Sequence, residues 1–289
     1  MKPNLIIFTN GYEGTWPSIE YGAWIAQNMR TSLTLVGVVE SNDAEHPVEE
    51  IFSQAVSLFQ ENQIDYSLEL EKGPAEAVII QKSDRDAGQM QIFGPFGRPP
   101  IRRIMVGNSF RHLMAAVKAP ILYVPVMRMP IKKVLICMGG LGYTITAEHL
   151  GLRVAQMAGA AVTLLTVVPP ISLDYPEARK IRDNWKDLAN TDTLTGRSLR
   201  EGIENAQKTG QEARVIVRHG NIVEQILAEA KRESYDLICM GSQYSAHGLR
   251  QLYTPNVTAD VAETSQCPIL TARYMQPEQG QPEHFGRAT

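Results

Sequence analysis

Short apolar runs alternate with segments of helical periodicity along the first 126 residues. The apolar runs predict buried strands, and apolar residues spaced three or four positions apart predict amphipathic helices between them. The predicted strands are 5–9, 33–39, 66–70, 90–93 and 121–126, and the predicted helices are 17–29, 48–59, 75–81 and 110–117. Because a helix separates each pair of successive strands, this order predicts an α/β fold, a parallel sheet covered by helices.

The same order of elements begins again after residue 130. Thr9, at the end of the first strand, is matched by Met138, 129 residues later, whereas Gly94 is matched by Gly241, 147 residues later. The extra residues fall in a long charged segment, 176–210, part of which keeps helical spacing. Repetition at many positions indicates an internal duplication.

The duplication divides the chain into two tandem domains. We expect the first to span residues 1–127 and the second residues 131–274. Residues 275–289 are rich in Pro, Glu, Gln and Gly, and this composition predicts a disordered tail.

A glycine-rich stretch follows the fourth predicted strand. Gly94 and Gly97 are three positions apart, nine residues separate Gly97 from Gly107, and Asn108 and Ser109 then precede a predicted helix. Glycine lets backbone N–H groups approach an anion, and a helix N-terminus presents unpaired N–H groups. The stretch therefore predicts a phosphate-binding loop, with a Gly/Pro-rich surface loop as the other interpretation.

Three arginines, Arg98, Arg102 and Arg103, lie in the same stretch. They offer cationic charge that phosphate oxygens accept, although arginines of exposed loops are commonly just solvated. Ser109 also has two interpretations, a phosphate-binding hydroxyl or an N-cap of the following helix.

Composition argues against nucleic acid and membranes as partners and favours a cytoplasmic location. The 28 Lys and Arg residues nearly balance the 31 Asp and Glu residues, so no excess positive charge points to nucleic acid or to an anionic membrane. No apolar run approaches the roughly 18–20 residues that span a bilayer, and the N-terminus does not resemble a signal peptide. The three cysteines are far apart and predict reduced, buried thiols in a cytoplasmic protein. The six histidines show no metal-ligand spacing.

The glycine spacing, taken together with the duplication, resembles the universal stress protein family, with two family domains in one chain. The family pattern of Gly-x-x-Gly, nine residues and Gly-Ser/Thr maps onto Gly94, Gly97, Gly107 and Asn108, with Ser109 one step after the expected hydroxyl. The resemblance implies two doubly wound domains of the adenine nucleotide alpha hydrolase type. Each would have a five-stranded parallel sheet in the order 3-2-1-4-5.

The resemblance also implies an ATP site, with or without Mg²⁺, in the first domain. Ligands of such sheets bind beyond the carboxyl ends of the strands, where strands 1 and 4 are neighbours. The implied nucleotide-binding residues are Asn10, Gly11, Val38, Gly94, Gly97, Arg98, Gly107, Asn108 and Ser109. Asn10 stands where ATP-binding members usually have an aspartate, and the backbone of Val38 would meet the adenine edge.

The second domain departs further from this pattern. Tyr244 stands at the position of the second glycine, Pro255 at that of the third, and Gly139 at that of the strand-1 aspartate. A side chain at the second position crowds the phosphates, and proline lacks an N–H donor. We expect this domain to bind ATP poorly or not at all and to serve as a partner surface.

Two functions remain open from the sequence. One is a stress-response regulator that binds an adenine nucleotide in the first domain. The other is an interaction scaffold or small-molecule binder with vestigial nucleotide sites. An enzyme is least favoured, with at most weak ATP hydrolysis, because no acid–base pair stands out. Family members commonly dimerise through the last strand, so we expect residues 121–126 to pair with 269–273 as an internal pseudo-dimer; a further homodimer stays open.

Overall fold

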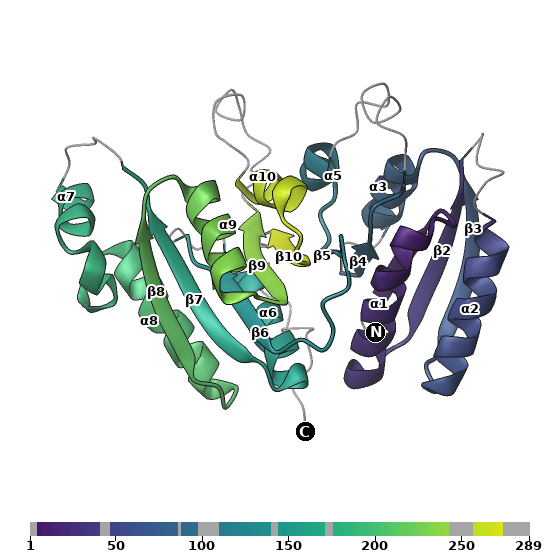
Figure 1. The fold of residues 1–289 in the computed structure, drawn as a ribbon, viewed down its shortest axis with the longest axis horizontal. Coiled ribbons are helices and arrows are strands. Elements are labelled where there is room, and N and C mark those ends of the chain that lie inside the picture. The colour runs from purple at the N-terminus through teal and green to yellow at the C-terminus, as the bar shows by residue number, and fades with distance from the viewer. Residues whose placement is uncertain are drawn as a thin grey trace.

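The computed structural model describes residues 5–40, 47–85, 88–97, 110–139, 144–170, 176–242 and 257–273. Figure 1 shows two α/β halves side by side, each built from strands with helices packed on both faces.

The first half begins with a strand and alternates strands with helices. Its strands are β1 (Leu5–Thr9), β2 (Leu33–Val39), β3 (Tyr66–Lys72), β4 (Met90–Phe93) and β5 (Ile121–Tyr123). Its helices are η1 (Glu13–Thr15), α1 (Trp16–Met29), α2 (Val48–Glu61), α3 (Ala75–Arg85) and α5 (Phe110–Ala116).

The second half repeats this order with additional helical segments. Its strands are β6 (Lys133–Cys137), β7 (Ala161–Val168), β8 (Ala213–His219), β9 (Leu237–Ser242) and β10 (Ile269–Arg273). Its helices are α6 (Ile145–Ala158), α7 (Pro176–Asp183), η2 (Trp185–Asn190), α8 (Leu194–Lys208), α9 (Ile222–Glu233) and α10 (Val257–Thr264).

All ten strands belong to one sheet, in the order β3-β2-β1-β4-β5-β10-β9-β6-β7-β8. Within each half the strands are parallel and follow the order 3-2-1-4-5. The predicted fold class, two doubly wound domains in tandem, is therefore confirmed.

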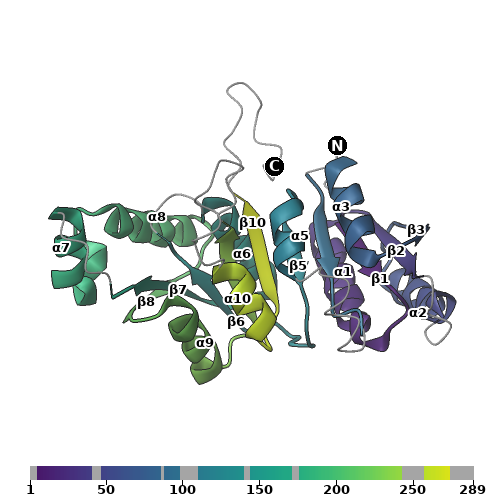
Figure 2. The same cartoon turned by 90° about the horizontal axis from the view of Figure 1, so that it is seen from above.

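The two halves meet at their last strands. β5 and β10 are antiparallel, with Leu122 opposite Leu270, and Figure 2 shows them side by side in the middle of the molecule. This is the strand pairing expected from the sequence, although β5 is shorter than predicted. Val124, beyond its end, still donates its N–H to the Phe93 carbonyl at 2.9 Å.

Glycines at matching positions bring one helix of each half close to the sheet. A Cβ at Gly22 in α1 would lie 2.3 Å from the Ile7 Cδ1 atom, and a Cβ at Gly151 in α6 would lie 2.7 Å from the Cys239 Sγ atom. Gly151 follows Gly22 by the same 129 residues that relate the first strands of the two halves. The duplication has thus kept a close helix–sheet contact that leaves no room for a side chain.

Helix starts in the second half follow from polar side chains at the N-caps. The Thr193 hydroxyl accepts a hydrogen bond from the Gly196 N–H at the start of α8, and the Asn221 side chain accepts one from the Glu224 N–H at the start of α9. These bonds satisfy N–H groups that the helix leaves unpaired. None of the helices in the described ranges is long and apolar enough to cross a membrane.

The charged segment that lengthens the second half forms α7 and η2 beside the outer strand β8. Leu188 of η2 is fully buried, and the Trp185 ring lies 5.9 Å from that of His219. The matching outer strand β3 has no such neighbour among the described residues, and its Leu68 and Leu70 are 40% and 55% exposed. Part of this segment is helical, as predicted, but residues 181–188 are divided between α7 and the 3-10 helix η2 and do not extend one continuous helix.

An ion pair links the outer strand of each half to the following helix. In the first half Lys82 of α3 binds Glu69 and also Glu71 of β3, the latter at 2.7 Å. Burial opposes the charged form of Lys82, but hydrogen bonds to the two glutamates outweigh it and raise the lysine pKa.

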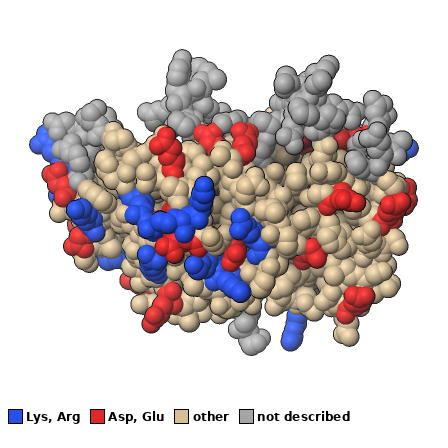
Figure 3. All heavy atoms as spheres, in the orientation of Figure 1, with Lys and Arg blue, Asp and Glu red and all other residues tan. Residues whose placement is uncertain are grey.

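The second half carries this pair with the charges reversed. Glu229 of α9, whose side chain is 1% exposed, lies 2.6 Å from Arg218 of β8 and 2.9 Å from Arg232. Burial acts against ionisation of Glu229, but hydrogen bonds from the two arginines outweigh it and lower the carboxyl pKa. Figure 3 shows Lys and Arg side chains gathered over this half.

Candidate functional site

The candidate site lies beyond the carboxyl ends of β1 and β4. These strands are neighbours, with Phe8 opposite Phe93, although two other strands separate them in the chain. Asn10 follows β1 directly and Gly94 follows β4 directly. This is the point of the sheet at which ligands of doubly wound folds bind.

Asn10 joins the loop after β1 to the loop after β4. It is 1% exposed, and its Nδ2 donates to the Phe96 carbonyl at 3.0 Å. Its Oδ1 accepts a longer hydrogen bond from the Tyr12 N–H at 3.4 Å. An aspartate has no donor to offer the Phe96 carbonyl, so the amide at this position has a structural reason.

Two buried threonines hold the turn after β1. The Thr15 hydroxyl donates to the Tyr12 carbonyl at 2.7 Å and lies 2.6 Å from the Thr9 hydroxyl. The Thr9 oxygen accepts a hydrogen bond from the Gly11 N–H at 3.2 Å. Gly11 has a φ of 84°, a left-handed conformation that favours glycine.

The Tyr12 ring lies against the second glycine of the predicted phosphate loop. A Cβ at Gly97 would lie 2.4 Å from the Tyr12 Cγ atom, and a Cβ at Gly14 would lie 2.4 Å from its Cε1 atom. Gly97 also has a φ of +59°. The ring is thus packed against the backbone at both glycines, and an anion approaching Gly97 from this side must displace it.

Gly94 also has a packing reason to be glycine. A Cβ there would lie 3.0 Å from the Gly14 carbonyl oxygen and 3.1 Å from that of Val124. Both are backbone atoms and have little freedom to move. The sequence predicted that Gly94 and Gly97 are glycines because they make room for phosphate. Contacts inside the protein are a second explanation, since a side chain at either position would meet other atoms of the chain.

Val38 lies near the end of β2, next to β1. The residue as a whole is 1% exposed, and its side chain packs in the same core cluster as Phe8 and Phe93. Both the side chain and the backbone of Val38 are therefore buried, and a contact between its backbone and a ligand stays a prediction.

The remaining predicted residues lie outside the described residues. These are Arg98, Arg102, Arg103, Gly107, Asn108 and Ser109. Of the nine predicted binding residues, the structure thus brings together Asn10, Gly11, Gly94 and Gly97, with Val38 on the neighbouring strand.

Sequence reasoning missed four residues that shape this crevice: Thr9, Tyr12, Thr15 and Phe96. The sequence held a signal for Thr9, because hydroxyl residues at a strand end commonly form hydrogen bonds to the backbone of the next turn. The contact of Tyr12 with Gly97 had no local signal, since the two residues are far apart in the chain.

The matching position of the second half has a different residue and different described neighbours. Gly139 occupies the place of Asn10, and among the described residues a Cβ there would meet only the Thr144 Cγ2 atom, at 3.7 Å. The residues predicted to spoil this second site, Tyr244 and Pro255, lie outside the described residues. No hydrogen bond in the described part of the chain links Gly139 to the end of β9.

The three cysteines are free and buried, as the sequence predicted. Burial raises the pKa of the Cys137 thiol to about 12, and that of Cys267 to about 12. They are therefore poor nucleophiles at neutral pH. Among the described residues, no three His, Cys, Asp or Glu side chains gather as a metal-binding group.

Comparisons with known proteins relate the chain to one family. The model of the Universal stress protein family matches residues 130–273. A universal stress protein from Archaeoglobus fulgidus is 16% identical, with a TM-score of 0.69 over 95% of this chain and 97% of that one. A functionally unknown protein from Pseudomonas aeruginosa is 14% identical, with a TM-score of 0.65 over 94% and 92%. No curated protein matches the chain. These structures share the fold along almost the whole chain.

Proposed function

Because residues 130–273 are a universal stress protein domain, we propose that the chain is a stress-response regulatory protein whose first half binds an adenine nucleotide, ATP. The observation that carries this proposal is the position of Asn10 and Gly94, which directly follow the neighbouring strands β1 and β4. The first half has the same strand order as the second, so its crevice lies at the corresponding switch point.

In this proposal the nucleotide lies across the ends of the two strands. The backbone at Val38 meets the adenine edge, and the loop that starts at Gly94 holds the phosphates. Arg98 and the backbone N–H groups at Gly107, Asn108 and Ser109 supply the donors, because phosphate oxygens favour Arg and helix N-terminal N–H groups. Mg²⁺, when present, neutralises part of the phosphate charge.

In this proposal the Tyr12 ring has to move before ATP can bind. Its ring covers Gly97, so a phosphate that contacts the Gly97 backbone requires the ring to move. Replacing it by serine, Tyr12→Ser, removes the obstacle, and we expect about a tenfold gain in ATP affinity. The turn after β1 should persist, because its hydrogen bonds to the Asn10 and Thr15 side chains involve the Tyr12 backbone.

Isothermal titration of the full chain with ATP and ADP tests the proposal. We expect binding by the wild type and its loss in Gly97→Arg and Gly107→Arg. Gly139→Arg, at the position of the second half that matches Asn10, is the control and should bind as the wild type does. Circular dichroism checks that each variant is folded. Absence of binding by the wild type, or unchanged binding by both first-half variants, would remove the proposal.

The second candidate function, an interaction scaffold with vestigial nucleotide sites, also has a specific observation in its favour. Gly94 and Gly97 are explained by contacts inside the protein, with the Tyr12 ring seated on Gly97. Native mass spectrometry of freshly purified protein separates the two functions. A co-purified adenine nucleotide supports the first, and a different bound molecule supports the second.

A further inference from the structure

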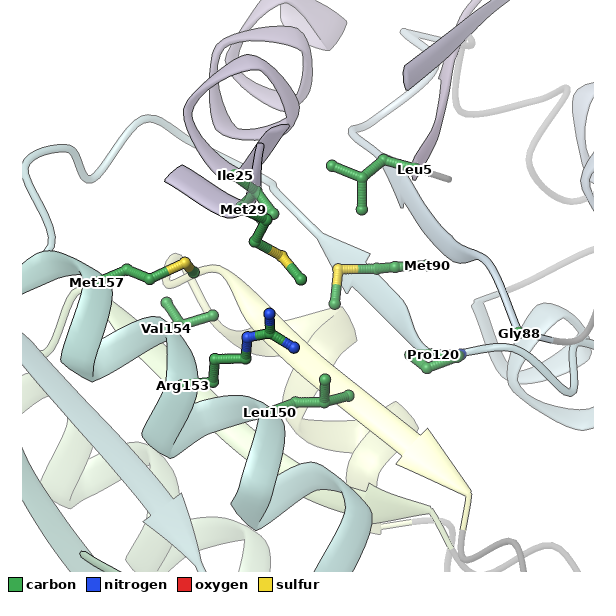
Figure 4. Close-up of a pocket in the computed structure, with 10 residues that line it drawn as sticks. All are labelled: Leu5, Ile25, Met29, Gly88, Met90, Pro120, Leu150, Arg153, Val154 and Met157. Carbon is green, nitrogen blue, oxygen red and sulfur yellow. The ribbon is translucent and has the colours of Figure 1, made fainter. Parts of the chain in front are cut away.

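A small cavity lies between the two halves, at the end of the sheet opposite the nucleotide crevice. It has a volume of about 20 Å³ and opens between α1 and α6, beside the first residues of β1 and β4. Figure 4 shows Met29, Met90 and Met157 around it, with Leu150 on the wall formed by α6. Both halves therefore contribute to its lining, which is almost wholly apolar.

One charged group projects into this apolar surround. The guanidinium of Arg153, from α6, lies among the methionine side chains in Figure 4. Arg153 is partly buried, and in the part of the chain that the structure describes it has no carboxylate or hydrogen-bond partner. A cation in low-polarity surroundings attracts an anion much more strongly than a cation in water.

A second cavity lies directly behind the first. It has a volume of about 10 Å³ and shares Ile25, Met90 and Val154 with the outer cavity. Its other walls include Leu122 of β5 and Leu270 of β10, the two strands that join the halves. The space behind Arg153 is therefore apolar and leads toward the centre of the interface.

A comparison of the two halves shows that the second half alone has an arginine at this position. The position that matches Arg153 in the first half is Trp24, 129 residues earlier, and Trp24 packs against the core. The neighbours Ile25 and Val154 match each other and both line the cavities. An apolar side chain on one side of the interface is thus replaced on the other by a cation next to an unfilled space.

We propose that these cavities bind a small amphipathic monoanion, a carboxylate with a short alkyl chain. The carboxylate pairs with the Arg153 guanidinium, whose fork of N–H donors matches two carboxylate oxygens. The alkyl chain enters between Met29, Met90 and Met157. Methionine is unbranched and has three rotatable bonds, so these side chains can turn to enlarge a space that now holds little more than one water molecule.

Octanoate is the probe, and methyl NMR of the full chain labelled at methionine is the measurement. We expect octanoate to shift the signals of Met29, Met90 and Met157. Octanamide keeps the chain length without the charge, and acetate keeps the charge without the chain; both should bind at least tenfold more weakly. The nucleotide is left out, so the result does not depend on the proposed ATP site.

Variants at Arg153 make the test specific. Arg153→Gln should weaken octanoate binding at least tenfold, and Arg153→Lys should keep part of the affinity because it keeps the charge. Arg197→Gln is the control, since Arg197 lies on α8 with its side chain 54% exposed and pairs with Asp192. Three outcomes overturn the proposal: no octanoate binding by the wild type, equal binding by Arg153→Gln, or shifts confined to other methionines. The second outcome would indicate that Arg153 only covers the interface with its apolar stem, and the third that octanoate binds elsewhere on the protein.

Discussion

The two halves of this protein share a strand order but treat the same crevice differently. In the first half, Asn10 ties the loop after β1 to the loop after β4, and the Tyr12 ring is packed on Gly97. In the second half Gly139 stands in the place of Asn10, and among the described residues a Cβ there would meet the Thr144 Cγ2 atom at 3.7 Å. The duplication has therefore kept the strand order around this position while changing the residue that follows the first strand.

The ion pairs between the outer strand and the following helix also differ between the two halves. Lys82 binds Glu71 in the first half, and Glu229 binds Arg218 at the matching positions of the second half, so the two charges have changed places. The attraction between them does not depend on which partner carries which sign. The positions of the paired residues are thus common to both halves, whereas the sign of the charge at each position differs.

The largest expected effect comes from the helix–sheet contact that both halves keep. Gly151→Val should lower the free energy of unfolding by about 3 kcal/mol, since it forces atoms into Cys239. Gly22→Val should cost less, because the atom it meets is the far end of the Ile7 side chain. Urea denaturation of both variants measures the difference. A larger loss for Gly22→Val would contradict the account.

Asn10→Asp tests whether the amide of the first half is structural. A carboxylate facing the Phe96 carbonyl loses the hydrogen bond and is repelled, so we expect a loss of about 2 kcal/mol at neutral pH. Burial and this repulsion would raise the pKa of the new carboxyl above its unfolded value. The loss should therefore shrink as the pH falls and the group takes up a proton. The same substitution without any loss of stability, measured by thermal unfolding across pH 4–8, would show that the bond to Phe96 is unimportant.

The reversed ion pair can be restored to the polarity of the first half. Glu229→Lys should destabilise the chain by about 2 kcal/mol, because it places a cation between Arg218 and Arg232. The double variant Arg218→Glu/Glu229→Lys should recover more than half of that loss. A double-mutant cycle by urea denaturation measures the coupling. Simple additivity of the two single changes would mean that the matching geometry does not govern the pair.

The smallest expected effect is on the pH dependence of stability. It concerns Glu148, at the position where the first half has Ile19. Burial raises the pKa of this carboxyl, although a hydrogen bond from Asn205 at 2.9 Å opposes the shift. The folded state then holds the proton more tightly, so stability is complete at low pH and falls as the pH rises through the folded pKa. Glu148→Gln should remove part of this slope, which thermal melts at several pH values measure. A slope of equal size in the variant would assign it to other groups.

Much of the architecture could be predicted from the sequence because it depends on many residues at once. Alternating apolar runs and helical spacing defined the strands, and the constant offset between the halves revealed the duplication. Burial of β1 along its whole length shows why such a signal is strong, since every position in a central parallel strand must be apolar or bonded.

The interior of the crevice could not be predicted in the same way. The bond from Asn10 to the Phe96 carbonyl joins residues 86 positions apart, and the Tyr12 ring meets Gly97 across a similar distance. No periodicity records a single side-chain contact of this kind. A glycine that makes room for a phosphate and one that makes room for a tyrosine ring look alike in a sequence.

Equilibrium dialysis of the full chain against labelled ATP tests the central claim, a nucleotide site in the first half alone. The account predicts one site per chain, which Gly97→Arg abolishes and Gly139→Arg leaves intact. No bound nucleotide, two sites per chain, or one site that Gly139→Arg abolishes would contradict it.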